Sequence, residues 1–252
     1  MPDLVRLRGV SKVFANGVQA LADVSLDIRT GEFLSVLGPS GCGKSTLLRL
    51  ISGLAAPSGG TIEGAGSGRA TRDHELGFVF QEPTLLPWAT ALANTLLPLK
   101  LQGMARSESE ARAAESLRLV GLGGFERAYP RELSGGMKMR VSIARALVTA
   151  PRLLLMDEPF AALDEITRHR LNADLLALWE RQHFTVVFVT HSVFESVFLS
   201  QRIAVMAARP GRVLSELVID APYPRSDSFR TSAEYAGFCR QTSARLGEAM
   251  AA

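Results

Sequence analysis

The chain has 252 residues, of which 47% are hydrophobic and 21% charged, so it can bury a substantial core. Its formal net charge of +3 is spread along the sequence without a basic block, which argues against a nucleic-acid-binding tail, and no nucleic-acid partner is expected. Its two cysteines, Cys42 and Cys239, stand in no CxxC or Cys/His cluster, which argues against a disulfide framework and a cysteine-based metal site.

No secretory signal opens the sequence, and no apolar run approaches the roughly 18 to 20 residues that cross a bilayer. We therefore expect a cytosolic protein that serves a membrane, if at all, through partners.

Short apolar runs alternate with longer helical patterns along the chain. The runs that predict strands buried on both faces are 33–37, 76–80, 153–156 and 185–189. The helical patterns are 44–53, 107–120, 137–149, 165–182 and 193–199. This alternation predicts an α/β fold with a mostly parallel sheet, in which ligands bind at the carboxyl ends of the strands.

The helical segment 82–150 interrupts this alternation and predicts a helical subdomain inserted in the core. Inside it, Ser107 and Glu110 have the spacing of a capping box that would open a helix. The glycines at 59–60 and 64–68 predict loops. After Pro210-Gly211 the pattern predicts a strand, a proline-rich linker and a short helix. We expect a single domain over 1–252, with a core of 1–81 and 151–215, the helical subdomain 82–150 and a C-terminal extension 216–252.

The strongest motif is the octapeptide GPSGCGKS at 38–45, which follows a predicted strand, opens a predicted helix and fits G-x-x-x-x-G-K-[ST]. This pattern is typical of a P-loop, whose backbone N–H groups form a nest for phosphate oxygens. In such a loop Lys44 reaches the β- and γ-phosphates, and the Ser45 hydroxyl coordinates Mg²⁺. Because Cys42 lies within the loop, alkylation of its thiol is expected to inhibit the protein, and bound ATP to protect it.

Polar side chains also follow three other predicted strands, at the same edge of the sheet. Asp157 can hold Mg²⁺ directly or through water, and Glu158 is placed to polarise a water for attack on the γ-phosphorus. His191 can bond the γ-phosphate or hold the attacking water. Gln81, a neutral amide, can touch both Mg²⁺ and water.

The tetrapeptide Leu-Ser-Gly-Gly at 133–136 precedes another predicted helix. Together with the motifs above and Ala-Leu-Asp at 162–164, it makes the chain resemble the nucleotide-binding subunit of the ATP-binding cassette (ABC) transporters over about residues 4–215. The resemblance implies a P-loop NTPase core, ATP and Mg²⁺ as cofactors, and a homodimer. In that dimer the Ser-Gly-Gly turn of one chain faces the ATP held by the other.

The resemblance also implies a role for each matching residue. Phe14 would stack on adenine, Gln81 would sense the γ-phosphate and touch the membrane subunit, and Asp164 would lie in the loop that crosses between subunits. Met137 stands where the family usually has Gln. The expected nucleotide contacts are Phe14, Gly38, Pro39, Ser40, Gly41, Cys42, Gly43, Lys44, Ser45, Thr46, Ser134, Gly135, Gly136 and Asp164. The expected catalytic residues are Glu158 as base, His191 as switch and Gln81, and the expected metal ligands are Ser45, Gln81 and Asp157.

Two further segments, FQEPTLLPW at 80–88 and AARPGR at 207–212, resemble the importer branch for nitrate, sulfonates, taurine and pyrimidine precursors. This implies an ATP-hydrolysing subunit that powers import of a small solute. Its partners would be integral membrane permease subunits and, indirectly, a solute-binding protein. The chain would then be a peripheral protein at the cytoplasmic face of the cell membrane.

Three alternative functions are weighed against this one. A P-loop GTPase would carry a guanine-reading Asn-Lys-x-Asp, and a P-loop kinase an acceptor pocket, but the sequence has no such tetrapeptide. Cassettes that act in translation or DNA repair generally carry two cassettes or a long coiled-coil insertion. A non-catalytic regulatory subunit is disfavoured by the intact Glu158 and His191.

Overall fold

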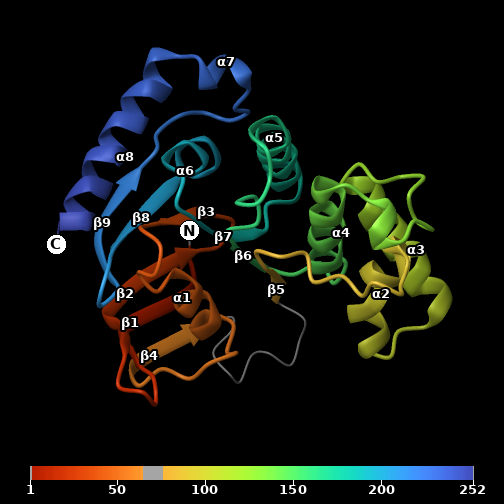
Figure 1. Ribbon diagram of the computed structural model, residues 1–252, viewed down its shortest axis with the longest axis horizontal. Coiled ribbons are helices and arrows are strands. Elements are labelled where there is room, and N and C mark those ends of the chain that lie inside the picture. The colour runs from red at the N-terminus through yellow and green to blue at the C-terminus, as the bar shows by residue number, and fades with distance from the viewer. Residues whose placement is uncertain (1, 65–75, 252) are drawn as a thin grey trace.

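The computed structural model describes residues 2–64 and 76–251 (Figure 1). The strands are β1 (Asp3–Val13), β2 (Gln19–Arg29), β3 (Phe33–Leu37), β4 (Gly59–Gly64), β5 (Leu76–Val79), β6 (Leu153–Asp157), β7 (Thr185–Thr190), β8 (Arg202–Ala207) and β9 (Arg212–Val218). The helices are α1 (Lys44–Ile51), α2 (Ala91–Leu101), α3 (Arg106–Leu119), α4 (Gly135–Leu147), α5 (Glu165–Gln182), α6 (Val193–Leu199), α7 (Asp227–Arg230) and α8 (Ala233–Ala251), with a 3₁₀ turn η1 at Pro130–Glu132.

The larger sheet has, within the described residues, six strands in the order β5-β6-β7-β3-β8-β9. All run parallel except β9, which pairs antiparallel with β8 at the edge. The predicted α/β fold with a mostly parallel sheet is confirmed. The carboxyl ends of β5, β6, β7, β3 and β8 therefore point to one edge, where the polar residues that follow these strands are gathered.

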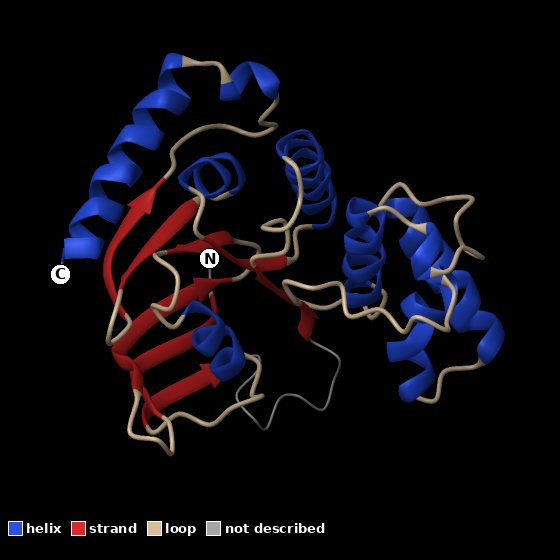
Figure 2. Ribbon diagram, in the orientation of Figure 1, coloured by secondary structure: helices blue, strands red, loops and turns tan. Residues whose placement is uncertain are grey.

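The central strands are apolar throughout because both of their faces are covered. Alternate residues of each strand enter different cores, so Phe33 joins one cluster and its neighbour Leu34 the other. The first cluster lies between the sheet and the helices α4, α5, α6 and α8. The second lies between the sheet, α1 and the strands β1 and β2. Figure 2 shows helices on both sides of the larger sheet.

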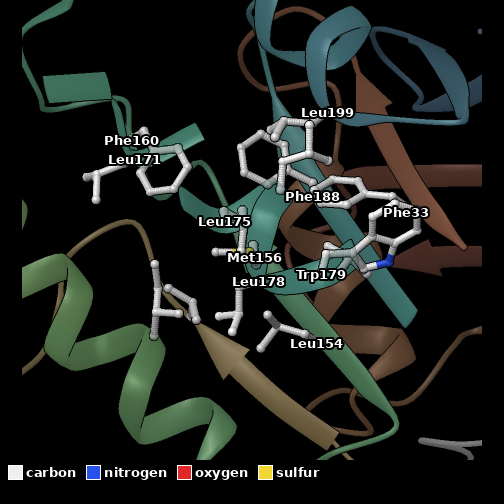
Figure 3. Close-up of a cluster of buried hydrophobic side chains, with 14 of the residues drawn as sticks. Phe33, Leu154, Met156, Phe160, Leu171, Leu175, Leu178, Trp179, Phe188 and Leu199 are labelled. Atoms are coloured by element: carbon white, nitrogen blue, oxygen red, sulfur yellow. The ribbon is translucent and has the colours of Figure 1, made fainter. Parts of the chain in front are cut away.

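Aromatic side chains fill the centre of the first cluster (Figure 3). Trp179 of α5 packs edge-on against Phe33 of β3, with ring centroids 5.7 Å apart. Phe160, three residues after β6, packs on Phe188 of β7 at 5.8 Å. Because Phe33, Phe160 and Phe188 are at most 1% exposed, this packing fixes the strand ends relative to one another.

A second sheet, β2-β1-β4, is antiparallel and has three strands among the described residues. Its edge strand β4 shows that the loop predicted at Gly59-Gly60 is wrong, because Ser11 pairs with Gly59 there. A Cβ on Gly60 would lie 2.4 Å from the carbonyl oxygen of Gly9, so this glycine permits a close approach of two backbones. Most of the segment predicted as a loop at 64–68 lies outside the described residues.

Helices α2, α3 and α4 pack on one another and project from the sheet beyond β5 and β6 (Figure 1). The capping box predicted at Ser107 is wrong, because the N-cap of α3 lies two residues earlier, at Ala105, and has no side-chain cap hydrogen bond. Ser107 therefore lies inside the helix, and Glu110 pairs with Arg106 at 2.7 Å instead.

The C-terminal region contains the predicted strand and linker and a short helix, the four-residue α7, but a second helix, α8, follows that was not predicted. α8 has 19 residues and packs against α6, β8 and β9. Its buried residues are Tyr235, Cys239, Thr242 and Ala249. Because some of them are small or polar, the sequence shows no clear apolar repeat of helical period there. Across the described residues, no helix combines the length and apolarity that crossing a membrane requires.

Candidate functional site

The P-loop connects the end of β3 with the start of α1. Gly41 and Gly43 have φ values of +78° and +94°, a left-handed conformation that glycine adopts without strain. A Cβ on Gly38 would lie 2.8 Å from Cys42 Sγ and from the Met206 carbonyl oxygen. α1 begins at Lys44 with no side-chain cap hydrogen bond, so its first N–H groups are available to an anion.

Lys44 is buried at the base of this loop, with 4% of its side chain exposed. Its Nζ donates hydrogen bonds to the carbonyl oxygens of Gly38 at 2.8 Å and Pro39 at 3.0 Å. The same Nζ lies 3.4 Å from Glu158 Oε1. The ammonium group is therefore held in place by the loop and by one carboxylate.

Ser45 and Asp157 join the P-loop to β6. The Ser45 hydroxyl donates to Asp157 Oδ1 at 2.9 Å. Burial raises the pKa of Asp157, the Ser45 hydrogen bond opposes that shift, and the charge of Glu158 adds to it.

The hydroxyl and carboxylate oxygens of Ser45 and Asp157 are of the kind that Mg²⁺ prefers. In the part of the chain that is described, no group of three or more His, Cys, Asp or Glu side chains could hold a metal ion. A cation at Ser45 and Asp157 would therefore need further oxygens, such as those of phosphates.

Glu158 follows β6 directly and contacts a residue that follows β7. Its Oε2 lies 2.9 Å from His191 Nδ1, while its other oxygen faces Lys44. The backbone of Glu158 has a φ of +45°, unusual for a residue with a Cβ, and its N–H donates to the Val189 carbonyl at 3.0 Å. The strained backbone aims the carboxylate at both partners.

A pocket of about 800 Å³ opens above these groups. Its lining residues are Phe14, Val18, Gln19, Ala20, Ser40, Gly41, Gly43, Lys44, Ser45, Thr46, Gln81, Glu158, Arg209 and Pro210. Asp157 and His191 do not line it but contact Ser45 and Glu158, which do. The expected contacts Gly38, Pro39 and Cys42 do not line it either, and Cys42 is fully buried. Phe14 is 42% exposed, so it is a rim residue and not a core aromatic.

Sequence reasoning missed the side of the pocket formed by residues 18–20 and by Arg209-Pro210. Arg209 follows β8 at the same sheet edge as the other site residues, and that placement could have identified it. Among the described residues, no hydrogen bond or ion pair engages its guanidinium. Residues 18–20 could not have been identified in the same way, because they follow no predicted strand and reach the pocket at the start of β2.

The Ser134-Gly135-Gly136 turn lies outside this pocket. Ser134 is the N-cap of α4, and its Oγ accepts from the Met137 N–H at 3.2 Å. Ser134 and Gly136 line a separate pocket of about 600 Å³, together with residues of α5. A Cβ on Gly136 would lie 2.8 Å from Thr167 Cγ2, so glycine is needed where α4 meets α5.

Asp164 caps the neighbouring helix, α5. Its Oδ1 accepts from the Thr167 N–H at 2.9 Å, and hydrogen bonding to the side chain of Thr167, then to its backbone, lowers the pKa of the Asp164 carboxyl. Asp164 is exposed and lines neither pocket. The structure thus gathers Lys44, Ser45, Asp157, Glu158 and His191, and leaves Asp164 and the Ser-Gly-Gly turn elsewhere on the surface.

The segment Gln81–Trp88 begins at the pocket and runs towards α2. Gln81 lines the pocket, whereas the Trp88 side chain is 74% exposed and is not part of the core. Arg145 of α4 donates to the carbonyl oxygens of Pro83 at 2.8 Å and Thr84 at 2.9 Å. One surface segment therefore connects the pocket with the helical projection.

Comparison with known proteins places these features in context. The family model described as "ABC transporter" matches residues 21–161. The nitrate import ATP-binding protein NrtD of Synechocystis sp. is 45% identical over 221 residues, which cover 86% of this chain and 83% of that protein. The taurine import ATP-binding protein TauB of Rhizobium johnstonii is 47% identical over 207 residues, which cover 82% of this chain and 79% of that protein.

Among solved structures, the chain is similar to the ATP-binding cassette MJ0796, a dimer in a post-hydrolysis state bound to ADP and Pi. The TM-score is 0.75 and the sequence identity 36%, over 86% of this chain and 100% of that one.

Proposed function

We propose that this chain, which belongs to the ABC transporter family, is the ATP-hydrolysing subunit that powers import of a small solute through a partner membrane permease. The observation that carries this function is the set of contacts Ser45–Asp157 and Lys44–Glu158–His191 below a pocket of about 800 Å³. The names of the two relatives favour a solute like nitrate or taurine, and the resemblance of segments 80–88 and 207–212 to their importer branch adds sulfonates. A pyrimidine precursor is the alternative solute, because the sequences LSGGMKM at 133–139 and FAALD at 160–164 resemble those members of the branch.

ATP would lie with its base against Phe14 and its phosphates against the P-loop. The free N–H groups at the start of α1 favour negative charge there. Lys44 would exchange its bonds to the loop carbonyls for bonds to the β- and γ-phosphates. Ser45, Gln81 and Asp157 would hold Mg²⁺, which offsets phosphate charge when bound.

Glu158 would accept a proton from the water that attacks the γ-phosphorus. Once Lys44 bonds the phosphates, Glu158 Oε1 would be free to accept a hydrogen bond from that water. His191 Nδ1 would keep its contact with Glu158 Oε2, and the other ring nitrogen, Nε2, would bond the γ-phosphate.

A second copy of the chain would complete each site with its Ser134-Gly135-Gly136 turn. That turn has no access to the P-loop pocket of its own chain, since it lines a different one. Two apolar side chains, Ile166 two residues after Asp164 and Phe194 three residues after His191, are 84% and 62% exposed, which suits a face that another copy covers. The dimeric cassette among the similar structures supports the same arrangement.

The surface from Gln81 to Trp88 would contact the permease, and would transmit opening and closing of the dimer to it. This assignment places the chain at the cytoplasmic face of the membrane. In it, residues 1–81 and 151–215 act as the nucleotide-binding core and 82–150 as the helical subdomain, with 216–252 as an extension. A solute-binding protein would act on the chain only through the permease.

Replacement of Glu158 tests the proposed function. We expect Glu158→Gln to bind ATP with nearly wild-type affinity, to hydrolyse it at least about 100-fold more slowly and to accumulate as a dimer. Lys44→Ala should lose nucleotide affinity. Equilibrium binding, phosphate release and light scattering measure the three quantities. A Glu158→Gln protein that turns over normally, or stays monomeric with saturating ATP, contradicts the assignment.

A further inference from the structure

The proposed reaction uses none of residues 219–251, yet this segment is bound to α6, the helix that follows His191. We propose that residues 219–251, here called the C-terminal brace, position His191 by holding α6 at both of its ends. This role rests on the proposed function, in which His191 faces the γ-phosphate. Figure 1 shows α7 and α8 wrapped around the side of the molecule where α6 lies.

The carbonyl groups at the C-terminal end of α6 accept hydrogen bonds from side chains of the brace. A helix of seven residues leaves its last carbonyl groups without partners inside the helix. Arg225 Nη1 donates to the carbonyl oxygens of Val197 at 2.9 Å and Phe198 at 3.1 Å. The Tyr223 hydroxyl donates to the Leu199 carbonyl at 3.0 Å. The brace thus supplies donors to three consecutive carbonyls at this end.

Arg225 is itself unusual, because it is a cation with 5% exposure and no carboxylate partner among the described residues. It donates three more bonds, to the carbonyl oxygens of Ser200, Ile219 and Ala221 at 2.9, 3.2 and 3.0 Å. Its guanidinium lies 4.2 Å from the Tyr223 ring centroid. The negative end of the α6 dipole and these carbonyls balance its charge, so its position and that of α6 depend on each other.

The first turn of α6 is held by α8. The Tyr235 hydroxyl donates to the Phe194 carbonyl at 2.9 Å. Near the C-terminal end of α6, the Arg230 guanidinium lies 3.4 Å from the centroid of the Phe198 ring. α6 therefore cannot shift along or across the sheet without breaking contacts to the brace.

The same first turn is tied to the residues on either side of His191. Thr190 Oγ1 donates to Glu195 Oε2 at 2.5 Å and accepts from the Ser192 N–H at 3.0 Å. Ser192 in turn caps α6 by accepting from the Glu195 N–H. A displacement of α6 consequently moves the turn that carries His191, and with it the contact to Glu158.

Two brace variants test this role. Arg225→Met and Tyr235→Phe keep most of the side-chain volume and remove the donors to α6. We expect Arg225→Met to lower kcat about tenfold and Tyr235→Phe about threefold, with KM for ATP within about twofold, because P-loop contacts are untouched. Arg245→Met is the control, since Arg245 lies on α8 and its one ion pair among the described residues is with Glu248 at the surface, and kcat should be unchanged.

A double variant distinguishes positioning of His191 from general damage. In a His191→Ala background, Arg225→Met should lower kcat further by less than about twofold, because the group it positions is gone. An equal loss in both backgrounds would overturn the role. So would folded Arg225→Met and Tyr235→Phe proteins with wild-type kcat. If Arg225→Met does not fold, Tyr235→Phe and Tyr223→Phe carry the same comparison.

Amide hydrogen exchange separates this role from the proposed function. In Arg225→Met, exchange of amides 192–199 should accelerate at least about tenfold, while the amides of β6 and α1 keep wild-type protection. If the wild-type chain hydrolyses no ATP, the proposed function fails, and this exchange pattern still decides whether the brace holds α6. Uniform acceleration, or none at 192–199, would overturn the brace.

Discussion

Glu158 shares its carboxylate between Lys44 on one side and His191 on the other, at 3.4 and 2.9 Å. Both neighbours are reached because its backbone adopts a φ of +45°. Ser45 and Asp157 form a second, adjacent contact at 2.9 Å. At the residue scale, the site thus consists of two sets of polar contacts that join the first turn of α1 to the end of β6 and to the residues that follow β6 and β7.

The raised pKa of Asp157 predicts that the stability of the folded protein depends on pH. Because its pKa is raised by burial, the ionised carboxylate destabilises the nucleotide-free fold. This loss of unfolding free energy is absent below the pKa of Asp157 in the unfolded chain, and it is complete once the pH has risen through the pKa of Asp157 in the folded protein. We therefore expect Asp157→Asn to melt at a higher temperature than wild type at pH 7, with a difference that shrinks as pH falls towards 3.8, the ordinary value.

Thermal unfolding between pH 8 and pH 4.5 measures this difference. Asp220→Asn, at an exposed carboxylate, is the control and should follow the wild-type curve. A less stable Asp157→Asn protein at pH 7, or a difference that grows on acidification, contradicts the prediction.

The Cys42 thiol is expected to react slowly with alkylating agents in the native protein. The thiol is fully buried, and burial raises its pKa against the opposing charge of Lys44. Less thiolate is then present near neutral pH, so modification in the native protein should be at least about tenfold slower than in urea and should accelerate as pH rises. Site-resolved mass spectrometry after iodoacetamide treatment measures this. Equal rates in both states would show that the loop opens freely. The inhibition and ATP protection expected from the sequence remain predictions.

At the scale of single elements, α4 connects two regions that lie far apart in the sequence. Ser134 caps its first turn, and Arg145 lies about 16 Å further along the axis. There Arg145 holds the carbonyls of Pro83 and Thr84, and Thr84 has a φ of +47°. One rigid helix therefore links the Ser-Gly-Gly turn with the segment proposed to contact the permease.

The hydrogen bonds from Arg145 to residues 83–84 are expected to contribute measurably to the stability of the fold. Arg145→Ala should lower the free energy of unfolding by about 1–3 kcal/mol, because the carbonyls of Pro83 and Thr84, the first of them in a part-buried contact, lose a charged donor. Arg106→Ala removes an exposed ion pair on α3 and should cost at most about 0.5 kcal/mol, which makes it a matched control. Urea denaturation gives both values. Equal losses in the two variants would mean that the link to residues 83–84 adds no stability.

At the scale of the whole molecule, the P-loop and the Ser-Gly-Gly turn, both expected to bind one ATP, line two separate pockets of the chain. The P-loop is at the carboxyl edge of the large sheet, and the Ser-Gly-Gly turn is at the start of the helical projection. Rigid packing keeps them apart, since Gly136 fits directly against α5. Two copies related by a twofold axis can bring each P-loop to the partner's turn.

Mixing two inactive variants tests this arrangement. Lys44→Ala disables the P-loop and Ser134→Arg blocks the turn, so each homodimer should be inactive. A heterodimer keeps one complete site, and an equal mixture should recover about a quarter of the wild-type ATPase activity if chains pair at random. Native mass spectrometry confirms that heterodimers form. A mixture that contains them but hydrolyses no more ATP than its components contradicts a shared site.

Much of the site was predictable because parallel strands deliver their last residues to one edge. The runs before Gly38, Gln81, Asp157 and His191 are visibly apolar, and each ends in a residue with a recognisable chemistry. Arg209 follows the same rule at β8 but was missed, because Arg-Pro-Gly carries no catalytic motif. The strands β1, β2 and β4 were also missed, since their half-exposed, bulged pairing lacks a continuous apolar run.

The sequence by itself determined the family, the fold class and the phosphate loop, because these depend on local patterns and short motifs. The tertiary structure alone decided which groups touch, from Glu158 between Lys44 and His191 to Arg225 below α6. It also revealed that the extension ends in a long helix and that the Ser-Gly-Gly turn has no access to its own P-loop pocket. The reason is that such contacts join residues from distant parts of the chain, whose distances are set by the packing of the sheet and helices and not by spacing along the sequence.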